Sequence, residues 1–370
     1  MKPILLFSFL LCLLLTGSRC KSPTEPEKPT GSDTTSHNFI WQVDTIGYRN
    51  TTLNDGVIIN ENDIWVVGEI YPDSASYKNG IAYGVAHWDG SNWTTKRVPV
   101  KSSWSSDYII NLQPQSICPL NDKEFMLGGA HIYDGEKVTK SFWLINYEGN
   151  PDPNPVFEIG QRPTKLFKTS AGEVYCYGSR GALGYFTGSS WVKIPTNTDL
   201  DIVDMHGDYN PKTGEYELLA LASRSLQKEG NLLLKVSNQT AVPILAMGLD
   251  DYSKDMLWFH QGGDYWIVGA GSFYKKSITD SLWKKREDYP SSNWYVADVN
   301  GTDSSNLFMT LHDGHLLHYN GSTWKDFKND LNLSGLAVGK IIIQNDLVII
   351  IGREFSANSR GIIIRGKHIN

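Results

Sequence analysis

The sequence predicts an all-β fold made of repeated units, and three observations support this prediction. Tryptophan, tyrosine and glycine occur 12, 18 and 34 times in 370 residues, as expected for aromatic strands separated by glycine turns. Two short motifs recur along the chain at similar intervals. The two ends of the repeated region also contain complementary strands, which would allow the repeats to close on themselves.

The composition bounds the class of protein. Hydrophobic residues make up 40% of the chain, enough for a large buried core. Lysine and arginine number 34 against 40 aspartates and glutamates, a net charge of -6. This mild acidity gives no electrostatic reason to expect nucleic acid as a partner.

The first twenty residues read as a targeting signal. Lys2 supplies a positive charge, residues 4–15 (ILLFSFLLCLLL) form an unbroken apolar run, and small residues follow at 16–18. The run is too short for a stable membrane span, so we expect a signal that is removed. The stretch LLLTGSRC resembles a bacterial lipoprotein signal, which implies that Cys20 is lipidated and becomes the first mature residue. Arg19 departs from that pattern, which has Gly or Ala there, and ordinary signal-peptidase cleavage is the alternative.

Residues 21–38 predict a disordered tether. They are rich in Pro, Thr, Ser and Glu and lack apolar periodicity, so they cannot bury enough surface to fold. A spacer between a lipid and a folded body is what an anchored protein needs, and acyl chains on Cys20 would be its membrane contact. We therefore divide the chain into a signal at 1–20, a linker at 21–38 and a folded body at 39–370.

Two cysteines belong to the folded body. Cys118 and Cys176 each lie in an apolar, strand-like run. Export would permit a disulfide, but the two runs belong to different repeat units. We expect two buried free thiols.

The first repeated motif is a turn followed by tryptophan. It occurs as HWDGSNW at 87–93, YFTGSSW at 185–191 and HYNGSTW at 318–324, with a degenerate copy expected at 146–150. Asp-Gly and Asn-Gly favour tight hairpin turns, and a tryptophan after the turn can pack between neighbouring sheets. His87 and Asp89 correspond to His318 and Asn320 in another copy. An amide in place of the carboxylate indicates a turn and not a catalytic site.

The second motif is an apolar strand that follows a polar residue and mostly ends in glycine. Its seven copies carry the markers Asp63, Glu124, Glu173, Glu215, Asp264, Asn306 and Asp346. They recur about every 40–60 residues, close to the length of a four-stranded propeller blade. The longest interval contains an insertion at 69–84.

The ends of the chain explain how such repeats would close. The last unit has three strands, in LAVGKIII, DLVIIIG and RGIIIRG, and then the chain ends. The stretch FIWQVDTIG at 39–47 fits the empty fourth position, and such closure removes exposed sheet edges. The architecture over 39–370 resembles a seven-bladed β-propeller closed by its N-terminal strand.

Resemblance to known propeller motifs concerns the fold and not an activity. The turn is similar to the Asp-box of sialidase-like propellers and to kelch-type turns, although Asp89 and Trp93 are four residues apart where an Asp-box has five. His312, His315 and His318 invite a zinc interpretation, but His315 and His318 would point to opposite faces of one strand. We expect no metal, no cofactor and no catalytic residue from these motifs.

Ligands of propellers usually bind on the face formed by the loops that follow the second and fourth strands, because loops on a rigid scaffold carry function. Aromatic side chains beside arginines suit sugars, acidic glycans or peptide carboxylates. The candidate ligand-binding residues on this face are Trp104, Tyr108, Arg180, Arg224, Trp294 and Arg353.

These observations lead to two expected functions. The first is a non-catalytic, monomeric module of the cell envelope that binds a glycan, a peptide or a partner protein. It would be exported and held at the outer membrane or cell surface by its lipid alone, or be periplasmic or secreted. The alternative is a carbohydrate-active enzyme of the glycosidase or lyase type, which would require acidic side chains from several blades to converge in the channel mouth.

Overall fold

The computed structural model describes residues 35–102, 105–142, 159, 161–210, 215–224, 231–237, 239–246, 254–260, 264–269, 272–277, 284–285 and 296–369. All of them belong to one compact unit, Thr34–Asn370. The predicted signal, Cys20 and most of the predicted linker lie outside the described residues. Among the described residues, no helix has the length and apolar character needed to cross a membrane.

The described strands form seven four-stranded antiparallel sheets and one two-stranded sheet. The first sheet along the chain consists of β2(Thr52–Asn60), β3(Asp63–Ile70), β4(Tyr83–Trp88) and β5(Trp93–Lys96). The second consists of β8(Ile117–Pro119), β9(Phe125–Leu127), β10(His131–Tyr133) and β11(Val138–Ser141). The third consists of β12(Gln161–Lys168), β13(Val174–Ser179), β14(Leu183–Phe186) and β15(Trp191–Lys193). The fourth sheet consists of β16(Asp201–Asn210), β17(Glu215–Ser223), β18(Leu232–Ser237) and β19(Thr240–Ala246). The fifth consists of β20(Lys254–Phe259), β21(Asp264–Gly269), β22(Ser272–Ser277) and β23(Lys284–Lys285). The sixth consists of β24(Val296–Asp303), β25(Asn306–Leu311), β26(Leu316–Tyr319) and β27(Trp324–Asp326).

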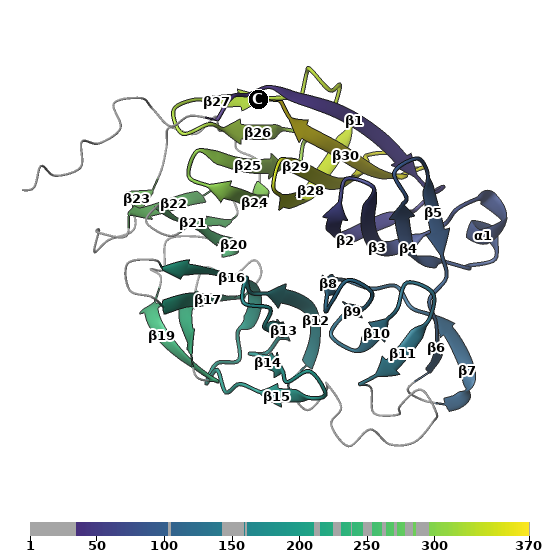
Figure 1. Ribbon diagram of the computed structural model, residues 1–370, viewed down its shortest axis with the longest axis horizontal. Coiled ribbons are helices and arrows are strands. Elements are labelled where there is room, and N and C mark those ends of the chain that lie inside the picture. Colours follow the sequence, from purple (N-terminus) through teal and green to yellow (C-terminus); the bar gives the residue numbers. More distant parts are fainter. Residues whose placement is uncertain are drawn as a thin grey trace, which may run out of the picture. The chain divides into compact units, whose positions relative to one another are not determined.

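The last sheet is closed by the N-terminal strand, as the sequence predicts. Its order is β28(Leu336–Gln344), β29(Leu347–Glu354), β30(Gly361–His368) and then β1(Phe39–Ile46), which pairs with β30 along its whole length. The first strands of successive sheets contact one another, except that β16 contacts β13 of the preceding sheet, and β28 contacts β2. Figure 1 shows these first strands around the centre of a ring. The prediction of an all-β propeller closed by its N-terminal strand is therefore confirmed.

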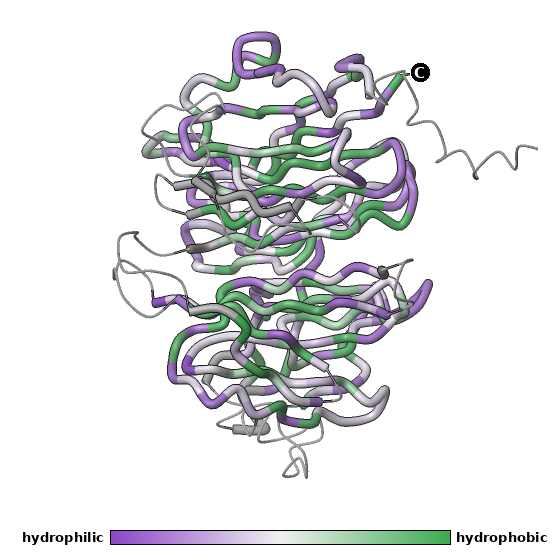
Figure 2. The backbone as a smooth tube through the Cα atoms, turned by 90° about the vertical axis from the view of Figure 1, so that its left-hand side faces the viewer, coloured by the Kyte–Doolittle hydropathy of each residue, from purple (hydrophilic) through white to green (hydrophobic). Residues whose placement is uncertain are grey.

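The core is divided into seven apolar clusters, one at each junction between neighbouring sheets. Alternate residues of a second strand enter opposite junctions. In β3, Ile64 and Val66 pack against the last sheet, whereas Trp65 and Val67 pack against the second. Because both faces of a blade are buried, its second strand reads as a continuous apolar run instead of an alternating one. Figure 2 shows hydrophobic residues concentrated in the strands.

The glycine that ends many second strands has a steric origin. A Cβ atom on Gly68 would lie 2.1 Å from the carbonyl oxygen of Thr52, and one on Gly352 would lie 2.4 Å from that of Ala337. In both sheets the first strand has a register shift next to this glycine. The bulge brings the two backbones too close for a side chain.

The turn motif is structural, as predicted. Oδ1 of Asp89 accepts the backbone N–H groups of Ser91 and Asn92, and Oδ1 of Asn320 does the same for Ser322 and Thr323. The second sheet has its copy at Asp134, whose Oδ1 accepts two N–H groups in the same way. The expected copy at 146–150 lies outside the described residues, and the sequence analysis missed the one at Asp134.

Two details of the connections refine the prediction. The insertion at 69–84 contains a short helix, α1(Ser74–Lys78), between β3 and β4. The segment after β5, expected to be a loop, instead forms the two-stranded sheet of β6(Pro99–Ser102) and β7(Ser105–Asn111). Cys118 and Cys176 are both buried and free, which confirms that prediction.

One side chain connects the closing strand to two others. Oδ2 of Asp44 in β1 accepts hydrogen bonds from Nε of Arg365 in β30 at 2.7 Å and from Nε1 of Trp93 in β5 at 3.0 Å. The Arg365 guanidinium also lies 3.8 Å from the centre of the Trp88 ring. Asp44 and Arg365 are each 14% exposed.

We predict that Asp44→Ala lowers the free energy of unfolding by about 3 kcal/mol, because it leaves the mostly buried Arg365 without its counter-charge. Glu61→Ala is the control. Glu61 pairs with Lys367, which lies on the same strand β30 as Arg365, but the side chains of Glu61 and Lys367 are both about half exposed. We expect it to cost no more than about 1 kcal/mol. Urea denaturation of both variants measures the difference, and equal losses would contradict the role of Asp44.

Candidate functional site

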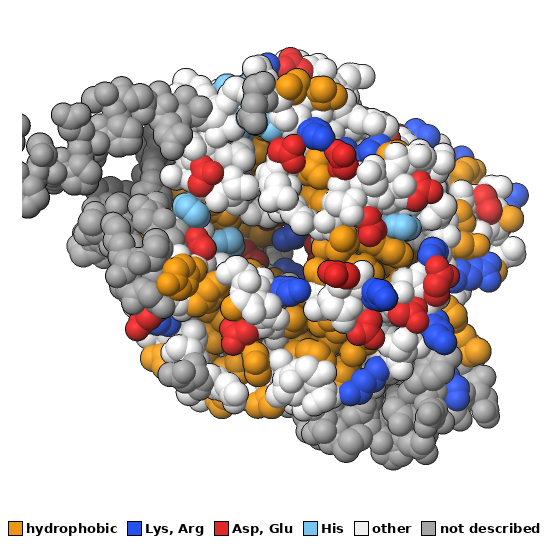
Figure 3. Space-filling model, viewed as in Figure 1, with side chains coloured by type: hydrophobic (Ala, Val, Ile, Leu, Met, Phe, Trp, Pro, Cys, Tyr) orange, Lys and Arg blue, Asp and Glu red, His pale blue; other side chains and the backbone are white. Residues whose placement is uncertain are grey.

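The first strands of the sheets line an axial channel whose cavity measures about 470 Å³. Six of its residues occupy equivalent positions, because each is paired with the second-strand residue that precedes the motif's terminal glycine or the residue in its place. Lys340 lies within the corresponding register shift of β28. We call these residues the lumen ring, which in chain order consists of Asp55, Ile117, Lys165, Asp204, Met256, Asp298 and Lys340. Figure 3 shows the central opening with basic side chains inside it.

Each carboxylate of the lumen ring is held by the next sheet. Oδ2 of Asp55 accepts the backbone N–H of Ile117 at 3.1 Å, Oδ2 of Asp204 accepts that of Leu257 at 2.8 Å, and Oδ2 of Asp298 accepts that of Ile341 at 2.7 Å. First strands of neighbouring sheets do not pair through their backbones. A carboxylate therefore supplies the acceptor that an N–H group facing the channel needs.

Two lysines offset the carboxylates of the lumen ring. Nζ of Lys340 lies 3.7 Å from Oδ2 of Asp298, and the nearby Asp298, Asp55 and Asp204 carboxylates raise the pKa of Lys340 despite its partial desolvation. Nζ of Lys165 donates to the carbonyl oxygen of Val203 in the neighbouring sheet. The channel is therefore polar and carries both signs of charge.

Burial raises the pKa of two carboxyl groups of the lumen ring, Asp55 and Asp204. The pKa of Asp204 rises to about 6, against the opposing effect of Lys340. Its second oxygen, Oδ1, lies 3.4 Å from the hydroxyl of Tyr177, whose own pKa burial also raises. Asp204 can hold a proton in mildly acidic solution, which Asp at its ordinary pKa does not.

The sequence analysis missed the lumen ring, although its acidic members share a signal. Asp55, Asp204 and Asp298 occupy the third position of LND, IVD and VAD, each near the start of a first strand and preceded by an apolar residue two positions earlier. An aspartate recurring at this place in three repeats indicates a shared environment.

A second feature lies on the loop face, which we define as the face carrying the connections after second and fourth strands. Residues 47–49, 334–336, 354–356, 358 and 360 surround a cavity of about 670 Å³, which we call the seam groove. It lies where β1 leaves the closing sheet and β29 turns into β30. Its position therefore depends on ring closure.

The seam groove combines a rigid hairpin with an exposed aromatic side chain. Glu354 and Arg360 form two side-chain hydrogen bonds across the hairpin, at 2.6 and 3.0 Å. The backbone N–H of Phe355 donates to the carbonyl oxygen of Gly335 at 2.7 Å, while the Phe355 side chain is 58% exposed. A fixed backbone with an exposed ring is a preorganised apolar contact point.

The opposite wall of the seam groove is aromatic and basic. Tyr48 packs edge to face with Tyr77, which packs in the same way with Tyr71. Arg49 lies 5.7 Å from the Tyr48 ring and forms no ion pair with any described residue. The hydroxyl of Tyr71 donates to Oε1 of Glu69 at 2.6 Å, and this bond helps to raise the Tyr71 pKa to about 12.

The predicted ligand-binding residues do not gather at one place. Trp104 and Trp294 lie outside the described residues, and only the backbone of Tyr108 is described, within β7. Arg180 donates its backbone N–H to Asp201, and Arg224 pairs with Asp199 at 3.0 Å, so both lie near one connection. Arg353 is in strand β29, next to the seam groove, and not in the loop expected for it.

The histidines of the suspected zinc motif are separated. His315 contacts Asp313 and Asp326 at 3.2 and 2.5 Å, whereas His318 is buried in a junction between sheets. Within the described ranges, no group of three or more His, Cys, Asp or Glu residues is placed to hold a metal ion.

Comparison with known proteins supports the fold. No protein-family model and no curated protein matches the chain. Among solved structures, YCF48 bound to D1 peptide is 15% identical, with a TM-score of 0.62, over 92% of this chain and 100% of that one. A catalytically inactive virginiamycin B lyase from Staphylococcus aureus with quinupristin is 9% identical, with a TM-score of 0.56, over 90% and 100% of the two chains. The WD40 β-propeller domain of Doa1 is 13% identical, with a TM-score of 0.53, over 87% and 96%.

We predict that Asp204→Asn stabilises the protein above pH 6 and that this gain disappears as the pH falls toward 4. Because the Asp204 pKa is raised to about 6 in the folded protein, the ionised carboxylate lowers the free energy of unfolding above that pH. This cost disappears as the pH falls and the folded protein takes up the proton. Asparagine does not titrate, and its oxygen can still accept the Leu257 N–H. The difference between variant and wild type should change by at most about 1.4 kcal/mol per pH unit.

Urea denaturation from pH 4 to 8 measures this difference. Asp201→Asn is the matched control, because Asp201 lies on the same strand and also accepts a backbone N–H, but does not line the channel. A pH-independent difference for Asp204→Asn would contradict the raised pKa.

Proposed function

We propose that the chain is an exported, lipid-anchored seven-bladed β-propeller that binds a peptide segment of a partner protein in its seam groove. The observation that carries this proposal is the exposed Phe355, held on a braced hairpin beside Arg49, which lacks an ion-pair partner among the described residues. An apolar contact next to a free guanidinium suits a peptide with an apolar side chain and a neighbouring carboxylate.

Three features favour a peptide over a glycan. Phe355, the exposed ring of the groove, has no hydrogen-bonding group for a sugar hydroxyl. Tyr77 is packed against both of the other tyrosines. A protein of similar fold has also been solved with a bound peptide, so a propeller of this kind can hold one.

The arrangement of the lumen ring favours binding over carbohydrate chemistry. Acidic side chains from three sheets do converge in the channel, as the enzyme alternative requires. Each, however, has one oxygen occupied by a neighbouring backbone N–H, and Lys340 interacts with all three. These contacts support a role of the carboxylates in holding the sheets together.

The proposed location is the cell envelope. The lipoprotein-like signal and Cys20 would place the body at the outer membrane or cell surface, with residues 21–34 as a spacer. The lipid would be its membrane contact, and the body would act as a monomer. Periplasmic or secreted protein would result if Cys20 were not lipidated.

Selection from a phage-displayed peptide library, with a glycan array in parallel, tests the proposed function on protein produced from residue 21. We predict that Phe355→Ala lowers the affinity for the selected peptide at least about tenfold, because a central contact is lost. Arg49→Ala should lower the affinity for acidic peptides and reduce the salt dependence of their binding.

Val242→Ala is the matched control, since Val242 is 56% exposed on the outer strand β19, outside the seam groove. It should leave the affinity unchanged. Binding to glycans alone, or peptide binding that neither groove variant weakens, would overturn the proposal.

A further inference from the structure

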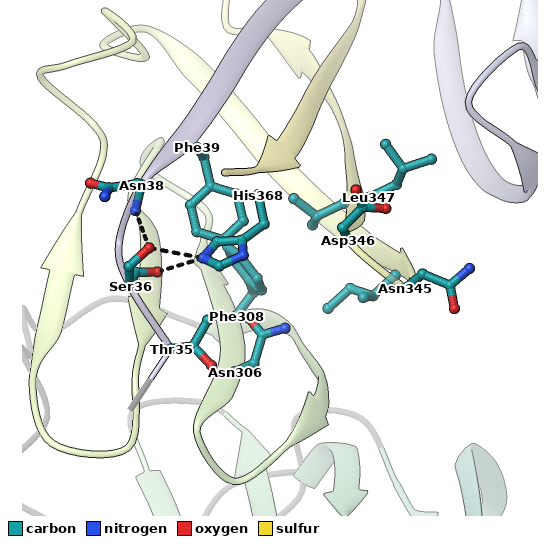
Figure 4. A pocket seen from close by; sticks show the side chains of 12 residues that line it. Thr35, Ser36, Asn38, Phe39, Asn306, Phe308, Asn345, Asp346, Leu347 and His368 are labelled. Atoms are coloured by element: carbon teal, nitrogen blue, oxygen red, sulfur yellow. Dashed lines mark hydrogen bonds between the residues drawn. The ribbon is translucent and has the colours of Figure 1, made fainter. Parts of the chain in front are cut away.

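The last residues before the closing strand form a strap on the face opposite the loop face. Residues 35–38 lie against the junction of the last two sheets, where they border a cavity of about 470 Å³ (Figure 4). The carbonyl oxygen of Asn38 accepts the N–H of Ile369 at 3.0 Å, and Oγ of Ser36 lies 2.9 Å from Nε2 of His368. Residues 36–38, which the sequence analysis assigns to the linker, thus contact the folded body.

The central contact of the strap is a pair of histidines. Nδ1 of His37 lies 2.8 Å from Nδ1 of His318, and the two rings meet edge to face. The residue His318 has no exposed surface and stacks on Phe308 at 4.5 Å between ring centres. His37 also contacts Oγ1 of Thr323 through its Nε2 at 3.1 Å.

The hydrogen bonds determine where the protons of this pair lie. Nε2 of His318 is 3.1 Å from Oδ1 of Asn306, an oxygen that can only accept. His318 is therefore a donor through Nε2 and, when neutral, an acceptor at Nδ1. His37 then donates its Nδ1–H to His318, while its Nε2 faces Oγ1 of Thr323, which also bonds Oδ1 of Asn320. Neither described hydrogen bond of His37 is to a carboxylate, so a proton added to His37 would place a positive charge near Lys325 with no counter-charge in contact.

From this geometry we propose that the strap is docked at neutral pH and released in mildly acidic solution, when His37 gains a proton. Release would expose the cavity beneath residues 35–38 and lengthen the tether by four residues, up to about 14 Å of extended chain.

The basic groups around the pair act in the same direction, whereas Asp303 opposes them by raising the His318 pKa. His37 comes from the strap, His318 from β26, His368 from β30 and Lys325 from β27, so basic groups approach from every side. The carboxyl groups facing this region are Asp303, at the end of β24, and Asp346, which lines the cavity. Both pKa values are lowered: that of His37 mainly by burial and then by Lys325, and that of His318 to about 3 by burial, then by His37 and His368.

The sign of the pH effect follows from these directions. A released His37 returns to its ordinary pKa of about 6.5, whereas the docked residue has a lower value. Docking is therefore fully favoured above about pH 6.5 and weakens as pH falls below it, by up to tenfold per pH unit for each proton taken up. This inference does not depend on the peptide function proposed for the opposite face.

A nitroxide at position 35 of the full chain tests the proposal. Attachment through a non-natural ketone side chain avoids the native cysteines. Electron paramagnetic resonance should show a restricted label at pH 7.5 and a freely moving one at pH 5, with a midpoint below 6.5. His37→Ala should be freely moving at both pH values, and since the change lies on the strap it leaves the sheets intact.

His37→Gln keeps a polar side chain that does not titrate, and it should shift the transition to lower pH or remove it. His312→Gln, which changes an exposed histidine of the loop face, is the matched control and should behave like wild type. The proposal fails if the wild-type label stays restricted at pH 5, or if His37→Gln retains the wild-type transition.

Discussion

The pairing of β1 with β30 is the interaction on which the rest of the structure depends. It brings residues 39–46 against residues 361–368 along eight consecutive pairs, and it completes the last sheet, so that neither edge of the ring remains open. Asp44 extends this closure to the first sheet through Trp93. The core has no single centre, because each junction between sheets contains its own apolar cluster. A ring built from such junctions is stable only when every one is made, including the junction between the last and first sheets.

Closure also creates the features that we associate with function. The seam groove lies where the chain leaves β1, and the strap lies where it enters β1. One strand thus connects a candidate binding surface on one face with a pH-sensitive contact on the other. The lumen ring is different, since it arises from a bulge repeated in the first strands, and its aspartates provide acceptors where the sheets meet at the centre.

Much of the fold could be predicted from sequence because its causes are local. The turn motif is recognisable because the side chain of Asp89 or Asn320 binds the backbone of its own turn. The second strands are recognisable because burial on both faces requires a continuous apolar run. The candidate site was predicted less well. The backbone N–H of Arg180 donates to Asp201 and the Arg224 side chain pairs with Asp199, whereas Arg353 lies in a strand elsewhere. Phe355 and Arg49 are 306 residues apart, and their proximity follows from ring closure, which a pattern within one repeat does not contain.

The central claim is that ligand binding occurs at the closure of the ring. Hydrogen exchange measured by mass spectrometry, with and without a selected peptide, tests it most directly. The account predicts slower exchange at residues 47–49, 334–336 and 354–360, with no change in the far connections at 180–182 and 196–200. Protection confined to those far connections, or spread through the channel strands alone, would contradict it.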